Sequence, residues 1–409
     1  MRRPPTSGRL TRGSLLISSL MVVGLAACGG PVSNGSNHTS TGSRGATPLY
    51  RFGVVGNRGK IARLQLERPT AVGGVEGTIT QIATSNSDGY ALTASGAVYA
   101  WGVANDGELG NGTTPAYDTT AVRVRFPAGV TIAALADPMP FDGALAIDTD
   151  GQAWGWGLNG DGDLCLSKTI NTVPARLALT DVTLASGARL HSLFDSHGKV
   201  VACGSDTDGV LGDGSTTTEG ATPVAVVRLP SDVGVSALTT SWEGSGALLA
   251  DGTYYDWGYN PHGQLGDGSR ADSDVPVKVA LPAPVRQVFQ GGSGATNGQS
   301  VALLSDGSVW AWGDNGRGQV GDGTTTDAPV PVRVHVPADV RFVTVDSGGY
   351  ASYAVDATGR LWAWGGNNNG QLGLGPGVRI ETEPVAVGIH VTAVSSTASN
   401  VAAALIATS

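Results

Sequence analysis

Residues Trp310–Val334 read WAWGDNGRGQVGDGTTTDAPVPVRV, and residues Tyr255–Val279 read YDWGYNPHGQLGDGSRADSDVPVKV, which is nearly the same phrase. Aligning each Trp-Gly pair that precedes such a phrase, or its degenerate counterpart, gives anchors spaced by 49, 55, 47, 54, 55 and 52 residues. The anchors are Phe52, Trp101, Trp156, Cys203, Trp257, Trp312 and Trp364. A period of about 50 residues is typical of propellers and solenoids. The sequence therefore predicts seven copies of one structural unit.

Each unit contains four apolar runs that are rich in β-forming residues. In the unit that starts after Ala328 the runs are PVPVRVHV, VRFVTV, ASYAV and RLWAWG, and DATG joins the third run to the fourth. Other units use LSDGS or LADGT at this joint, and Asp-Gly between alternating apolar runs is a strong hairpin signal. Each unit is therefore predicted to be a four-stranded antiparallel sheet, and such sheets repeated around an axis form a β-propeller.

The two ends of the chain complement one another. The last segment, NVAAALIATS, matches the third run and stops before a fourth, whereas PLYRFG at residues 48–53 supplies a fourth run without its predecessors. Pairing these segments removes two exposed sheet edges. We therefore predict an all-β fold over residues 48–409: a seven-bladed β-propeller of four-stranded antiparallel blades, closed by pairing of the N- and C-terminal strands in one blade.

The recurring phrase ALLSDGSVWAWGDNGRGQVGDGTTTDAPVPV resembles the regulator-of-chromosome-condensation repeat. The resemblance implies a seven-bladed propeller with this four-strand unit and one blade shared by the termini. Two consecutive units depart from the pattern, because Cys165 stands at a consensus glycine and Cys203 at a consensus tryptophan. Repeat positions give no distance between these cysteines, so both a disulfide and two free thiols stay open.

The N-terminus is typical of an exported lipoprotein. Four arginines precede the apolar run Leu15–Ala27, which is too short to span a bilayer comfortably and ends at LAAC, a sequence that resembles a lipobox. We predict a lipoprotein signal peptide at 1–27, lipidation and membrane anchoring at Cys28, and a flexible Gly/Ser/Asn/Thr-rich tether at 28–47. Removal of 1–27 takes the formal charge from −9 to −13, which opposes nucleic-acid binding.

No pattern in the sequence indicates catalysis or a metal. NGDGD at Asn159–Asp163 fails the EF-hand template, because the sixth position is Leu164 and the twelfth is Ile170. DSHG at residues 195–198 is predicted to be a turn, since adjacent residues of a hairpin point in alternating directions. The remaining histidines of the ring lie in separate units without metal-binding spacing. We expect no enzyme activity, no metal and no cofactor.

The units differ most just before or at the start of the third run. These loops carry the five candidate partner-binding rim residues Tyr90, Phe141, His191, Trp242 and Tyr350, with Arg189 and Glu243 among the charges beside them. Repetition places equivalent loops at one rim of a ring, and aromatic anchors on rigid loops are typical of protein-recognition surfaces. The alternative is that these rings only cover the blade ends. Arg317 is expected in a loop at the opposite side of the unit.

We therefore predict an extracytoplasmic, lipid-anchored propeller that binds a protein partner through one rim. Three other functions stay open. The family resemblance suggests an inhibitor of a secreted or envelope enzyme such as a β-lactamase-like hydrolase, or a guanine-nucleotide-exchange regulator. The third is an enzyme acting on envelope polysaccharide, which carboxylates facing one another in the central channel would favour.

Overall fold

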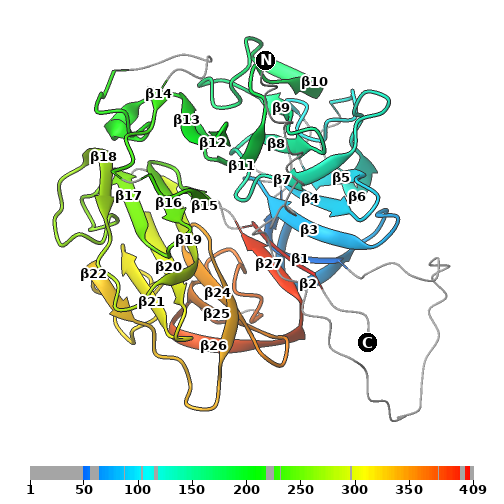
Figure 1. Ribbon diagram of the computed structural model, residues 1–409. Coiled ribbons are helices and arrows are strands. Elements are labelled where there is room, and N and C mark those ends of the chain that lie inside the picture. Colours follow the sequence, from blue (N-terminus) through cyan, green and yellow to red (C-terminus); the bar gives the residue numbers. More distant parts are fainter. Residues whose placement is uncertain are drawn as a thin grey trace, which may run out of the picture.

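The computed structural model describes residues 49–55, 64–86, 88–102, 105–114, 118–217, 225–230, 232–294, 297–375, 377–396 and 401–405. The predicted signal peptide, Cys28 and the tether lie outside these residues. The described chain is all-β apart from the single-turn 3-10 helix η1 (Thr207–Gly209), and its strands form antiparallel four-stranded sheets arranged around an axis (Figure 1).

Six sheets are blades of four consecutive strands, whose first strand lies nearest the axis and whose fourth lies at the outer edge (Figure 1). Three of them are β3 (Ile79–Thr84), β4 (Asp88–Thr93), β5 (Val98–Gly102) and β6 (Asp118–Arg123); β7 (Ile132–Leu135), β8 (Gly143–Asp148), β9 (Ala153–Leu158) and β10 (Ile170–Arg176); and β11 (Val182–Gly187), β12 (His191–Ser196), β13 (Lys199–Gly204) and β14 (Ala225–Val226). The others are β15 (Val235–Thr240), β16 (Gly244–Leu249), β17 (Tyr254–Gly258) and β18 (Ser273–Lys278); β19 (Val285–Gly294), β20 (Asn297–Leu304), β21 (Val309–Gly313) and β22 (Ala328–Arg333); and β23 (Phe342–Ser347), β24 (Ala351–Asp356), β25 (Arg360–Gly366) and β26 (Ile380–His390).

The remaining sheet takes two strands from each end of the chain, in the order β27 (Ala393–Ser396), β28 (Val401–Leu405), β1 (Leu49–Val55) and β2 (Leu64–Val72). Phe52 on β1 lies opposite Ala402 on β28, and β27 contacts the inner strands β3 and β23 of the flanking blades. The seven-bladed description is therefore corrected to six blades of four consecutive strands and one sheet assembled from both termini.

The sequence unit and the blade are also out of phase by one strand. The run PVPVRVHV, placed first in its unit, forms β22, and β22 pairs with β21 of the preceding phrase rather than with the run that follows it. Each blade therefore consists of the second, third and fourth runs of one unit and the first run of the next. Repetition reveals a period but does not mark where a unit begins.

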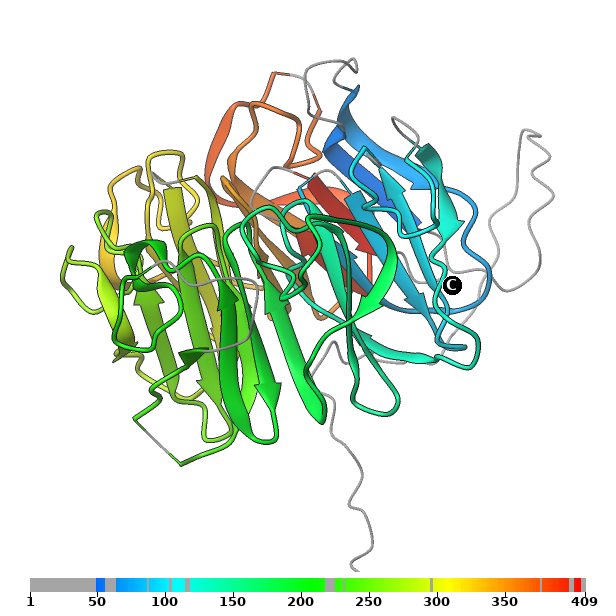
Figure 2. The same ribbon diagram turned by 90° about the horizontal axis from the view of Figure 1, so that it is seen from above.

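Neighbouring blades are joined by tryptophans in their third strands. Trp156, Trp257 and Trp364 are fully buried, and their indole Nε1 atoms donate to the carbonyl oxygens of Glu108, Val210 and Gln319, which belong to the preceding blades. Figure 2, which shows the sheets from the side, places the connecting loops at their two ends. Because each tryptophan contacts the blade before it, these contacts hold the inter-strand loops rigidly.

Within the part of the chain that the structure describes, no helix has the length and apolar character needed to cross a membrane.

Candidate protein-binding surface

Three successive blades contribute one side chain each to a compact group on the ring. Phe141 precedes β8, Arg189 lies between β11 and β12, and Trp242 precedes β16. The Phe141 and Trp242 rings meet edge to face, with centroids 4.8 Å apart, and the Arg189 guanidinium lies 4.4 Å from the Trp242 centroid. We call Phe141, Arg189 and Trp242 the rim cluster. Arg189 is exposed and both rings are partly exposed, so the cluster faces solvent.

A small cavity of about 20 Å³ adjoins the rim cluster. Besides the three cluster residues, its lining includes Met139, Ala188, Gln290 and Ser396, which come from blades on several sides of the ring axis. Gln290 and Ser396 belong to the inner strands β19 and β27. The cluster therefore borders the axial end of the ring, where the inner strands of several blades converge.

Carboxylates border the rim cluster. Burial raises the pKa of Glu243 to about 7, and the negative charges of Asp208 and Asp272 add to this effect, while Arg189 opposes it. Asp142, which directly follows Phe141, is partly exposed. Glu108 is buried beneath this surface, and burial raises its pKa to about 7, with Asp106 and Asp142 acting in the same direction. This surface therefore combines apolar rings and one guanidinium with a surplus of acidic groups.

The structure brings together only Phe141 and Trp242 of the five predicted rim residues. Tyr350 is partly exposed but lies in the loop before β24, where the Arg317 guanidinium stacks 4.4 Å from its ring centroid. Arg317 was expected at the opposite side of the unit, and this contact corrects that expectation. It also removes Arg317 as a control for binding at the rim.

Tyr90 and His191 are interior residues, each 0% exposed. The Tyr90 hydroxyl donates to the Glu108 carbonyl oxygen, and His191 Nε2 lies 2.6 Å from Ser245 Oγ of the next blade. Tyr90 lies inside β4 and His191 is the first residue of β12, whereas Phe141, Trp242 and Tyr350 all precede their strands. A shift of one to four residues in these aligned loops therefore moves a side chain from the rim into the core.

Two carboxyl groups, one on an inner strand and one just after another inner strand, interact with each other. Asp137 follows the inner strand β7, and its pKa is raised to about 7 by burial; Asp346, on the inner strand β23, has its pKa raised by burial and by the charge of Asp137. Ser395 Oγ donates to Asp137, and Asp346 is 2% exposed. Because glycoside hydrolysis requires two carboxyl groups that a sugar can reach, this pair does not favour the polysaccharide-active alternative.

A second cluster that contains acidic residues is already hydrogen-bonded to neighbouring protein groups. Atoms of His262, Asp314 and Asp327 lie within 4.8 Å of one another, a set that could hold a metal. However, Asp327 Oδ2 contacts His262 Nδ1 and Arg270, and the two Asp314 oxygens accept bonds from Gly316 N and Gln319 Nε2. These donors and the nearby guanidinium make this set a hydrogen-bonded tie between neighbouring loops.

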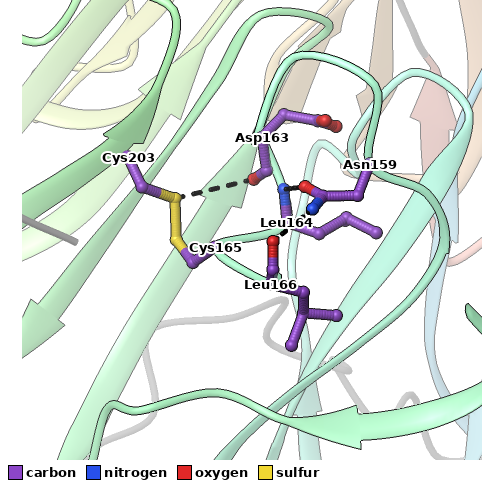
Figure 3. The surroundings of a disulfide bond; sticks show 6 residues. All are labelled: Asn159, Asp163, Leu164, Cys165, Leu166 and Cys203. Atoms are coloured by element: carbon purple, nitrogen blue, oxygen red, sulfur yellow. Dashed lines mark hydrogen bonds between the residues drawn. A yellow bond between two sulfur atoms is a disulfide. The ribbon is translucent and has the colours of Figure 1, made fainter. Parts of the chain in front are cut away.

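Cys165 and Cys203 form a disulfide between consecutive blades, with Cα atoms 5.7 Å apart (Figure 3). Cys165 lies in the loop after β9, and Cys203 lies on β13 of the next blade, 3.8 Å from the Asp163 carbonyl oxygen. This pairing, left open by the sequence, places Cys203 where other blades carry the junction tryptophan.

Comparisons with known proteins agree with this architecture. The regulator of chromosome condensation (RCC1) repeat model matches residues 251–295, 306–355 and 358–404. The chain is 29% identical over 354 residues to the ultraviolet-B receptor UVR8 of Arabidopsis thaliana, covering 85% of this chain and 67% of that protein. It is 26% identical over 301 residues to the E3 ubiquitin-protein ligase HERC2 of Mus musculus, covering 70% of this chain and 6% of that protein, so it spans a small part of HERC2.

Among solved structures, Prp20p of Saccharomyces cerevisiae, studied for its binding to Gsp1p and histones, matches with a TM-score of 0.74 and 21% identity. The match covers 90% of this chain and 93% of Prp20p, and at this identity it shows the fold alone. The family model thus identifies regulator of chromosome condensation (RCC1) repeats in the C-terminal part of this propeller, between residues 251 and 404.

Proposed function

We propose that this protein is a binding module that recognises a protein partner through the rim cluster, outside the cytoplasm, while a lipid on Cys28 holds it at the membrane. The observation that carries the binding role is the convergence of Phe141, Arg189 and Trp242 from three neighbouring blades. Partly exposed aromatic and arginine side chains on a rigid support are the residue types that dominate binding energy at interfaces.

The use of this fold by a similar protein supports the same role. The structure of Prp20p is described together with its binding to Gsp1p and histones, so an RCC1-type propeller can bind proteins. The partly exposed acidic residues beside the cluster, Glu243 and Asp142, favour a partner with a basic contact region. The predicted net charge of the exported chain, −13, favours the same partner chemistry.

The location outside the cytoplasm is supported by two independent features. The N-terminal sequence ends its apolar run at LAAC, and the Cys165–Cys203 disulfide suits an oxidising compartment. Cys28→Ser is expected to release the folded protein from membranes into the soluble fraction. Unchanged membrane association of this variant would contradict the lipid anchor.

The binding role is tested with affinity capture from envelope extracts by the purified full chain, followed by measurement of the affinity for the captured partner. Trp242→Ala and Phe141→Ala are each expected to weaken binding by roughly 30-fold, because losing one interface anchor costs about 2 kcal/mol.

Tyr350→Ala is the matched control. Tyr350 is also a partly exposed aromatic residue that stacks with an arginine, but it lies two blades beyond Trp242, with the blade β19–β22 between them. Its replacement should leave the affinity within about twofold, which is below 1 kcal/mol. Equal losses in all three variants, or losses explained entirely by unfolding, would contradict a binding site at Phe141, Arg189 and Trp242.

A further inference from the structure

A second cavity lies between the blade β15–β18 and the blade β19–β22, behind the loop that carries Trp242. It has a volume of about 20 Å³, which is room for about one water-sized occupant. Its lining includes two carboxylates, Glu243 and Asp256, and two carboxamides, Gln290 and Gln299. Asp256 and Gln299 are each 1% exposed and Gln290 is 7% exposed, so these three side chains lie almost entirely inside the protein, whereas Glu243 is partly exposed.

Hydrogen bonds from the amide nitrogens fix the orientation of the Gln290 and Gln299 side chains. Gln290 Nε2 donates to Asp256 Oδ1, and Gln299 Nε2 donates to the Gly348 carbonyl oxygen at 2.7 Å and to Ser347 Oγ at 3.2 Å. With both amino groups committed, the carbonyl oxygens must point elsewhere. Among the described residues these two Oε1 atoms are buried without a hydrogen-bond partner, although both side chains line the cavity.

The carboxylates add two further buried oxygens. Glu243 Oε2 and Asp256 Oδ2 also have no hydrogen-bond partner within the described part of the chain. Burial raises the pKa of Asp256 well above its usual value, and the Trp312 indole only partly opposes this effect. Trp312 Nε1 is itself buried without completing a hydrogen bond. Four residues that line a space for one occupant therefore each carry a buried oxygen without a hydrogen-bond partner.

The backbone keeps this space open. Gly244 lines the cavity, and a Cβ added there would lie 2.7 Å from Ser241 Oγ and 3.9 Å from Gln290 Oε1. A side chain at position 244 would therefore fill the cavity or displace its lining. Leaving polar groups buried without partners is costly, so an occupant that pairs with them would stabilise the ring.

The number and type of these groups determine the occupant. One water molecule donates two hydrogens, so it can pair with at most two of the four oxygens, whereas a bound cation can contact oxygens of all four residues and would favour the ionised form of both carboxyl groups. Hard divalent cations bind carboxylate and amide oxygens together, and Ca²⁺ does so in flexible geometry with waters completing its shell. We propose that Glu243, Asp256, Gln290 and Gln299 form a binding site for a hard divalent cation of the Ca²⁺ class.

The position of the site has a consequence for the surface above it. Glu243 directly follows Trp242, and Ser241 and Gln290 line both this cavity and the one beside the rim cluster. A cation bound here would fix the loop 241–243 between β15 and β16. The site itself does not depend on the proposed partner-binding function, since cation binding is measured without a partner.

The test uses the purified full chain, first treated with a chelator and then titrated with Ca²⁺ by calorimetry and thermal unfolding. We expect a Kd of roughly 10⁻⁴ to 10⁻³ M and an upward Tm shift of about 2 °C at saturation. Mg²⁺ should bind more weakly, because it demands near-octahedral geometry and keeps its waters. No Ca²⁺ binding by the parent protein at millimolar concentration would overturn the site.

Glu243→Gln and Asp256→Asn each remove a negative charge while keeping the side-chain shape, and each should weaken Ca²⁺ binding at least about tenfold. Glu243 is partly exposed, so its variant carries the test if the Asp256 variant does not fold. Asp208→Asn is the matched control, because Asp208 acts on Glu243 through its charge but does not line the cavity. Equal weakening in all three variants, or in none, would overturn the assignment.

Discussion

Two kinds of junction between neighbouring blades can be compared in the described residues, and they differ in a single pair of residues. At the tryptophan junctions, a glycine in the loop of one blade faces a tryptophan ring of the next; an ideal Cβ on Gly212 would lie 2.6 Å from Trp257 Nε1, and one on Gly321 would lie 2.6 Å from Trp364 Nε1. At the other junction, Cys165 replaces the glycine and Cys203 replaces the tryptophan.

The comparison shows that positions 165 and 203 share one space, so a larger side chain at one requires a smaller side chain at the other. Removing an indole at position 203 makes room for a side chain at position 165, and the two small side chains then join covalently. Cys165 keeps the left-handed backbone of the glycines it replaces, with φ of 54° against 69° for Gly212 and 80° for Gly321. A non-glycine residue in this conformation carries strain, which the cross-link and the surrounding contacts must offset.

The largest effect is expected from breaking a tryptophan junction. Trp257→Ala should destabilise the ring by about 3–5 kcal/mol, because it leaves a large buried cavity. It also removes the donor to the Val210 carbonyl oxygen. Urea unfolding monitored by circular dichroism measures the loss. Trp310→Ala, which changes a partly buried tryptophan on the same type of strand, should cost clearly less; equal costs would show that the junction has no special weight.

The disulfide junction should respond to reductant, whereas the tryptophan junctions should not. Replacing both Cys165 and Cys203 by alanine should cost about 2–4 kcal/mol, since the cross-link restricts the unfolded chain. The parent protein in a reducing buffer should approach the stability of this double variant. If reductant leaves the urea midpoint of the parent unchanged while free-thiol assays show full reduction, the cross-link contributes little.

The sequence predicted the repeat and its strands because both depend on local patterns. Asp-Gly turns and alternating apolar runs are readable wherever they occur, as in the turn at Asp306 and Gly307 between β20 and β21. The predicted boundary between one four-stranded sheet and the next was wrong by one strand. β22 pairs with β21 across a long loop, and no local sequence pattern indicates this pairing. Strand pairing at this distance depends on tertiary packing.

The candidate surface was predicted in part for a related reason. Equivalent loops do cluster, but burial depends on whether a ring precedes the strand, as in Trp242, or lies within it, as in Tyr90. Counting from the hairpin glycines could have separated these cases, because Gly143 and Gly244 pair with Gly157 and Gly258 in the same register. The cavity lined by Gln290 and Gln299 has no sequence signal, since its oxygens meet only across two blades.

The next effect concerns pH at the junction beside Trp257. Burial lowers the pKa of His191 to about 3, well below the unfolded value of about 6.5, so the folded state binds fewer protons between these values. This contribution to the free energy of unfolding is complete above about pH 6.5 and is lost progressively as the pH falls toward 3. The loss reaches about 2 kcal/mol at pH 5. His191→Asn should flatten this part of the pH profile of unfolding relative to the parent, after subtraction of effects common to both. Parallel profiles for parent and variant would contradict a neutral, buried His191.

The smallest net effect is expected when the exceptional junction is converted into a tryptophan junction. Cys203→Trp alone places an indole against the Cys165 side chain, where a glycine leaves room at other junctions, and such overpacking costs about 1–3 kcal/mol in addition to the lost disulfide. Adding Cys165→Gly removes that overlap and supplies the residue best suited to the left-handed backbone at position 165. The double variant should therefore be more stable than Cys203→Trp by at least about 1 kcal/mol and should no longer respond to reductant. Because the Asp163 carbonyl oxygen already faces position 203, the new indole has an acceptor equivalent to the Val210 carbonyl oxygen that accepts from Trp257.

A double-mutant cycle measured by urea unfolding tests this coupling. Additive costs would mean that positions 165 and 203 do not compete for the same space, and that the glycine and the tryptophan at the other junctions are there for separate reasons.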